Sequence, residues 1–242
     1  MKKNYTLFLL LFFFCNFASA KVYGVIVGVE KYDGSVPNLG SSVDDASKIY
    51  NLYNNGINEL IFLSDSKATL SNIIAALSIF KKAKPTDTII FYFSGHGTQG
   101  AFAPNNVLYG KNALYYSEIK TAFKASKARI KMCIVDACYS GGLTKSKSNT
   151  NTGTLQDNSN IILFMSSRNY QTSIESNRIN AGFFTYYFVE GVKGRADDNK
   201  DRQVTAYELY RYVKGNVVNV SNKTQSPMMI GKFNKELIIS KY

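Results

Sequence analysis

Residues 128–142 read Ala-Arg-Ile-Lys-Met-Cys-Ile-Val-Asp-Ala-Cys-Tyr-Ser-Gly-Gly, and this stretch decides how the rest of the chain is arranged. The apolar, branched run from Ile130 to Val135 is typical of a strand that is buried on both faces. Gly141 and Gly142 end this strand. Cys138 is therefore expected where a central strand of an α/β sheet opens into a loop, the edge at which such sheets meet their ligands.

A second stretch has the same form. Residues 88–93 are an apolar strand, Thr-Ile-Ile-Phe-Tyr-Phe, followed by Ser-Gly-His-Gly at 94–97, and His96 is the only histidine of the chain. Two parallel strands would bring His96 and Cys138 to one edge of the sheet, as nucleophilic catalysis by a thiol and a base requires. A structural histidine is the alternative, but a site between two glycines at a strand end serves packing poorly.

The remaining pattern alternates strands with helices, which predicts an α/β protein with a mostly parallel sheet covered on both faces. We expect further strands at 21–29, 59–63, 161–165 and 236–239, a short extended segment at 107–109, and helices at 44–54, 71–82, 117–126, 183–192 and 205–218.

Residues 1–20 have the features of a secretory signal. Lys2 and Lys3 precede an apolar run from Leu7 to Phe14, and Ala-Ser-Ala at 18–20 is a small-x-small cleavage site. The apolar run is too short to span a membrane. We therefore expect a single domain at 21–242, exported to the periplasm or secreted, beginning at Lys21.

Charge and cysteine content exclude other classes. The chain has 29 basic and 17 acidic residues. Without Lys2 and Lys3 of the proposed signal, its net charge is +10. The basic residues are scattered, which favours a basic surface over a nucleic-acid site. Cys133 and Cys138 lie on one strand about 16 Å apart, too far for a disulfide. Cys133 is expected in the core, and Cys138 as a free thiol.

Together, Ser-Gly-His-Gly at 94–97 and Asp-Ala-Cys-Tyr-Ser-Gly-Gly at 136–142 resemble the caspase-like cysteine peptidases, specifically their bacterial metacaspase-like branch. The histidine precedes the cysteine by 42 residues, close to the spacing in that family. The resemblance extends over 21–240 through further segments at 28–32, 43–46, 166–167, 175, 182–185 and 225–227.

This resemblance implies the caspase-like three-layer fold, with a six-stranded, mostly parallel sheet between helices. It implies peptide-bond hydrolysis through an acyl-enzyme, with Cys138 as nucleophile and His96 as general base and acid. The backbone N–H groups of Gly97 and Cys138 would hold the oxyanion. The sequence shows no third catalytic residue. We expect no cofactor, and we expect the protein to be a monomer.

The same resemblance suggests specificity for Lys or Arg before the cut. Asp45 and Asp136 correspond to acidic groups of a metacaspase-like pocket, with Ser42 and Ser94 as smaller lining residues, and buried carboxylates suit a cation. Asp45 could instead be a helix N-terminal carboxylate. Tyr139 replaces an arginine of the caspase motif, which argues against cleavage after Asp. A non-catalytic relative that binds basic peptides is the alternative function.

Two loops allow further hypotheses. Residues 144–160 form a polar, low-complexity loop in which Lys145 and Lys147 could be sites of self-cleavage, although an uncut flexible loop fits equally well. Residues 197–208 place oxygen ligands at several calcium-loop positions, but Arg202 stands where that loop needs glycine. We therefore favour a polar turn in which Thr205 caps the next helix, and predict no metal site.

Overall fold

The computed structural model describes residues 20–34, 36–98, 100–108, 111–137, 161–167, 175–176, 181–231 and 233–242. Several predictions fall on residues outside these ranges. They concern the thiol and the N–H of Cys138, the residues Tyr139, Gly141 and Gly142, the two lysines of the 144–160 loop, and residues 1–19 of the proposed signal.

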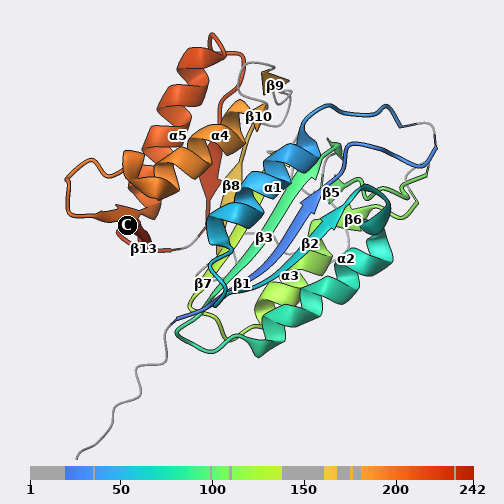
Figure 1. Ribbon diagram of the computed structural model, residues 1–242, viewed down its shortest axis with the longest axis horizontal. Coiled ribbons are helices and arrows are strands. Elements are labelled where there is room, and N and C mark those ends of the chain that lie inside the picture. The colour runs from blue at the N-terminus through green and yellow to red at the C-terminus, as the bar shows by residue number, and fades with distance from the viewer. Residues whose placement is uncertain are drawn as a thin grey trace, which may run out of the picture.

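A six-stranded sheet forms the centre of the molecule, in the order β12-β8-β7-β3-β1-β2 (Figure 1). Five of the strands are parallel to their neighbours, and only β12 runs antiparallel, against β8. These strands are β1 (Val22–Gly28), β2 (Glu59–Ser64), β3 (Thr88–Gly95), β7 (Ile130–Ala137), β8 (Ile161–Met165) and β12 (Met228–Ile230). The α/β class and the six-stranded, mostly parallel sheet predicted from the sequence are confirmed.

Helices cover both faces of this sheet and make three layers (Figure 1). One face packs against α2 and α3 around Phe80, Phe91 and Phe123, and the other packs against α1, α4 and α5 around Tyr92, Phe164 and Phe188. The helices are α1 (Ser42–Tyr53), α2 (Leu70–Leu77), α3 (Tyr116–Ala125), α4 (Phe183–Glu190) and α5 (Ala206–Val220), with shorter helical turns η1 (Asp65–Lys67), η2 (Ser78–Lys82) and η5 (Gly191–Arg195).

Among the described residues, three small sheets lie outside the central one. In the first, β5 (Ala101–Phe102) pairs with β4 (Gly97–Thr98) and with β6 (Leu114–Tyr115); the others pair β9 (Glu175–Ser176) with β10 (Ala181–Gly182), and β11 (Gln203–Thr205) with β13 (Ile238–Lys241). In the described residues no helix has the length and apolar character needed to cross a membrane.

The strand predicted at 236–239 lies outside the central sheet. It contributes to β13, which pairs with β11, whereas the edge of the central sheet is β12, where the sequence indicated no strand. A three-residue strand is too short to show the period-2 alternation on which strand prediction depends. The segment predicted at 107–109 contributes only one isolated bridge, from Leu108 to Lys111, among the described residues.

Candidate active site

His96 follows β3 directly and is held by the loop that connects β1 to α1. Its backbone N–H donates to the Tyr32 hydroxyl at 2.7 Å, and the two rings lie 5.1 Å apart, centroid to centroid. Gly95 makes this approach possible, because a Cβ atom there would lie 2.8 Å from the Tyr32 hydroxyl oxygen. The glycine before His96 therefore has a packing role that the sequence did not reveal.

The same loop orients the imidazole ring. The Nε2 atom of His96 lies 2.8 Å from the carbonyl oxygen of Pro37. A carbonyl can only accept a hydrogen bond, so Nε2 carries the proton in this arrangement and Nδ1 of the neutral ring is the atom with a free lone pair. The Pro37 carbonyl thus orients the imidazole, although the sequence showed no third catalytic residue.

Gly97 starts the small antiparallel sheet that follows His96. Ala103 donates its N–H to the His96 carbonyl at 3.0 Å, and Gly97 lies opposite Phe102. These two facts make Gly97 and Phe102 a non-hydrogen-bonded pair of the ladder, in which neither residue bonds to its partner's backbone. The ladder with β5 therefore does not use the N–H of Gly97.

Two buried carboxylates meet beside the same sheet edge. Asp45, on α1, is 2% exposed, and Asp136, at the end of β7, is 5% exposed. The N–H of Gly182 lies 3.1 Å from both carboxylate oxygens of Asp45. A Cβ atom on Gly182 would lie 2.7 Å from Oδ2 of Asp136 and 3.1 Å from Oδ2 of Asp45. Segments far apart in sequence thus bring these two carboxylates together around one glycine.

Two consecutive hydrogen bonds, both donated by hydroxyl groups, lead to the carboxylate of Asp136. Thr185, on α4, donates from Oγ1 to Oδ2 of Asp136 at 2.8 Å, and the Tyr92 hydroxyl lies 2.7 Å from the same Oγ1. Because the single proton of the threonine hydroxyl goes to Asp136, Tyr92 is the donor to Thr185. Burial raises the pKa of Tyr92 well above its ordinary value, and the negative charges of Asp45 and Asp136 raise it further. Tyr92 therefore keeps its donor proton.

Ser94 and Ser42 lie next to the two carboxylates. Ser94 is paired across the sheet with Asp136 on one side and with Gly28 on the other. Ser42 begins α1, and its carbonyl oxygen would lie 2.6 Å from a Cβ atom on Gly28. The four pocket residues predicted from the sequence are thus gathered at the carboxyl ends of the parallel strands, and all four are buried.

Four groups that form hydrogen bonds to His96, Asp45 or Asp136 were not identified from the sequence. They are the Tyr32 hydroxyl, the Pro37 carbonyl, the Gly182 N–H and the Thr185 hydroxyl. Gly182 and Thr185 belong to a segment that resembles the peptidase family, but nothing in the sequence indicated that they contact the carboxylates. A backbone carbonyl has no sequence signal of its own, so Pro37 could not have been found.

The 197–208 segment forms the polar turn that we favoured. The Asp197 carboxylate accepts backbone N–H groups from Lys200, Asp201 and Arg202. Thr205 caps α5, accepting the Glu208 N–H at 3.2 Å, as predicted. Within the described part of the chain, no group of three or more His, Cys, Asp or Glu residues is arranged to hold a metal ion.

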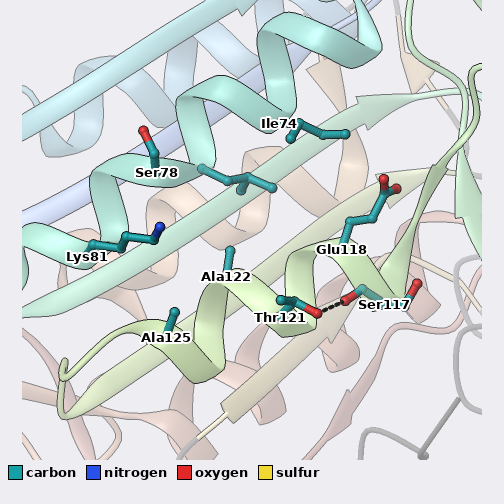
Figure 2. A pocket seen from close by; sticks show the side chains of 9 residues that line it. Ile74, Ser78, Lys81, Ser117, Glu118, Thr121, Ala122 and Ala125 are labelled. Carbon is teal, nitrogen blue, oxygen red and sulfur yellow. Dashed lines mark hydrogen bonds between the residues drawn. The ribbon is translucent and has the colours of Figure 1, made fainter. Parts of the chain in front are cut away.

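A separate groove lies on the opposite face of the sheet, between α2 with η2 and α3 (Figure 2). It has a volume of about 490 Å³ and is lined by residues such as Ile74, Lys81, Glu118 and Ala122. None of the predicted site residues lines it. His96, Asp45 and Asp136 are not among the residues that line the groove.

A family model and two curated relatives match this chain. The family model described as the caspase domain of Peptidase_C14 matches residues 21–238. Metacaspase-1 of Saccharomyces cerevisiae, from strains YJM789 and S288c, is 31% identical over 86 residues, which is 31% of this chain and 20% of that protein. This chain therefore matches only a fifth of the length of these curated relatives.

One solved structure with a similar fold is that of protein GSU0716 from Geobacter sulfurreducens. The two chains have a TM-score of 0.65 and are 17% identical, over 87% of this chain and 94% of the other. At this level of identity the likeness concerns the fold alone.

Proposed function

Since the chain belongs to the caspase-domain family of Peptidase_C14, we propose that it is a cysteine endopeptidase with Cys138 as nucleophile and His96 as general base and acid. The observation that carries this proposal is the hydrogen bond between Nε2 of His96 and the Pro37 carbonyl. This bond leaves Nδ1 of the ring as the atom that can take a proton. Cys138 follows the last residue of β7 in the chain, and β7 is paired with the strand that ends just before His96.

In the proposed reaction, Nδ1 of His96 takes the thiol proton of Cys138, and the sulfur attacks the carbonyl carbon of the scissile bond. The N–H groups of Gly97 and Cys138 bind the oxyanion. The imidazolium then protonates the leaving amine, and the acyl-enzyme remains. A water molecule, deprotonated by the same nitrogen, hydrolyses the thioester and restores the thiol.

We propose further that the residue before the cut is Lys or Arg. Two carboxylates converge on Gly182 beside the sheet edge, with exposed fractions of 2% for Asp45 and 5% for Asp136. Carboxylates bind a cationic side chain through charge-assisted hydrogen bonds, so this pair favours Lys or Arg in the pocket. The carboxylate of an Asp side chain would be repelled by both.

A peptide library tests both parts of the proposal. Purified protein should cleave after Arg and Lys, with a preference over Asp of several orders of magnitude, and Asp136→Ala should remove this preference. His96→Ala should lose cleavage, since no other histidine exists in the chain to replace it. Normal turnover by His96→Ala would contradict the catalytic role of His96, and faster cleavage after Asp would contradict the specificity for Lys or Arg.

Thiol labelling separates the enzyme from the alternative, a non-catalytic relative that binds basic peptides. Burial raises the pKa of the Cys133 thiol, and this side chain is 0% exposed, so Cys133 is protected in the folded protein. An arginine chloromethylketone should therefore add once, at Cys138, to each chain that begins at Lys21 and so lacks Cys15, and Cys138→Ala should take up none. Binding of the same peptide without any covalent adduct would favour the non-catalytic alternative.

We also propose that residues 1–20 are removed during export, which leaves Lys21 as the first residue of a periplasmic or secreted enzyme. The charged start, the apolar run and the Ala-Ser-Ala ending support this. N-terminal sequencing of protein recovered from outside the cytoplasm tests it.

A further inference from the structure

Asp87 is a buried carboxylate that the proposed reaction does not use. It ends the turn that leads into β3 and is 3% exposed. Its Oδ2 accepts the N–H of Lys84 at 2.7 Å, and its Oδ1 accepts the backbone N–H of Lys21 at 3.0 Å. A contact across 66 residues therefore joins this carboxylate to the residue that follows the proposed cleavage site.

The described part of the chain offers this carboxylate no cation. No lysine or arginine side chain there lies within 4.0 Å of it. The side chain of Lys21 points elsewhere, with Nζ 4.0 Å from Oε1 of Glu59. A buried carboxylate held only by neutral donors retains much of its desolvation cost. A positive charge placed at the Lys21 nitrogen would offset that cost.

Hydrolysis of the bond between Ala20 and Lys21 would create this charge. Water adds across the peptide bond, Ala20 leaves with the new carboxylate, and Lys21 keeps the nitrogen, which is an ammonium at neutral pH because α-amino groups have a pKa of about 7.7–8.0. The nitrogen is already in place: Thr88 donates to the Lys21 carbonyl at 2.9 Å, so Lys21 extends the pairing of β1 with β3 by one residue.

We propose that Asp87 is the binding site for the α-ammonium group that maturation creates on Lys21. The resulting ion pair fastens the start of β1 to the start of β3. Removal of the leader is then a stabilising step as well as a step of export. The proposal does not depend on peptidase activity; it depends on cleavage after Ala20.

The test compares the unfolding temperatures of chains that carry Cys138→Ala, so that no sample can cut itself. One chain begins at Lys21, released from a fusion without extra residues, and the other begins at Ala20, which moves the ammonium about 3.8 Å along the chain. Each is made with Asp87 and with Asp87→Asn. With Asp87, the Lys21 chain should melt about 3 °C or more higher, and with Asp87→Asn this difference should disappear.

Asp44→Asn is the matched control, because Asp44 is an exposed carboxylate in the first turn of α1 and its loss should leave the difference intact. Should Asp87→Asn not fold, acetylating the α-amine of the Lys21 chain tests the same charge and should lower its unfolding temperature to that of the Ala20 chain. The proposal would be overturned if the two chains had equal unfolding temperatures with Asp87 present. It would also be overturned if the difference persisted in Asp87→Asn, or if the mature chain began at a residue other than Lys21.

Discussion

Thr185 donates a hydrogen bond of 2.8 Å to Asp136, and this bond links α4 to the end of β7 inside the candidate pocket. Both side chains are buried, and the Tyr92 hydroxyl donates in turn to Thr185. A buried carboxylate that accepts a hydrogen bond from a fixed hydroxyl is held in one orientation. The relay from Tyr92 through Thr185 therefore positions the carboxylate that we propose for recognition of a basic residue.

Replacing Thr185 with valine should weaken the use of basic substrates. Thr185→Val keeps the shape but removes the donor, and one hydrogen bond to a charged group contributes about 1.5–3 kcal/mol. We expect kcat/KM for Arg peptides to fall roughly ten- to hundredfold, mainly through KM, and Thr185→Ser to restore it. Thr121→Val, which removes an exposed hydroxyl bonded to the Ser117 carbonyl, is the matched control and should have little effect. Unchanged KM in Thr185→Val would contradict the positioning role.

Gly182→Ala tests whether the two carboxylates need the space that glycine leaves. The new Cβ atom would lie 2.7 Å from Oδ2 of Asp136, so at least one carboxylate must move. We expect kcat/KM for Arg peptides to fall at least about tenfold, since small displacements at a site are costly. Gly215→Ala is the control: it is on α5 with nothing within 4 Å of its Cβ position, and it should stabilise the protein by about 0.5–1 kcal/mol. Full activity in Gly182→Ala would show that the carboxylates need not stay where they are.

The free energy of unfolding should fall as the pH rises from about 9 to 11. Burial raises the pKa values of Cys133, Tyr92 and Tyr116 in the folded protein, whereas in the unfolded chain they ionise near the ordinary values of 9.0 and 10.0. Between the unfolded and folded values the native state binds more protons, so the stability present at lower pH is lost as the pH rises, by about 1.4 kcal/mol per pH unit and group.

Chemical denaturation at several pH values measures this slope. Cys133→Ala should shift the onset of the decline upward, toward pH 10, because the group that ionises first in the unfolded chain has been removed. A flat profile from pH 8 to 11 is inconsistent with the burial of these three groups.

Self-cleavage should occur after Lys145 or Lys147. Both are of the residue type that we propose for the pocket, and both follow Cys138 within ten residues of chain, so the local concentration of the bond is high. New N-termini at residues 146 or 148 should appear in wild type and be absent from Cys138→Ala. An active wild-type protein that remains one chain from Lys21 would show that processing is not part of the mechanism.

The class of fold, the family and the position of His96 at the end of a strand were all predictable from the sequence. Apolar strands that alternate with helices are local signals that the tertiary structure did not override, as β3 and β7 show. The sequence also named Ser42, Asp45, Ser94 and Asp136, and their catalytic-site roles stay predictions. Cys138 was placed by its motif alone.

The groups that surround these residues could not be predicted, because long-range packing brings them there. The hydrogen bond from His96 to Pro37 spans 59 residues, and the bond from Gly182 to Asp45 spans 137. A backbone carbonyl or N–H group looks the same at every position of a sequence, so its role follows only from the packing that brings it to a side chain. The edge strand β12 was missed for a related reason, because it is defined by its pairing with β8 rather than by a local pattern.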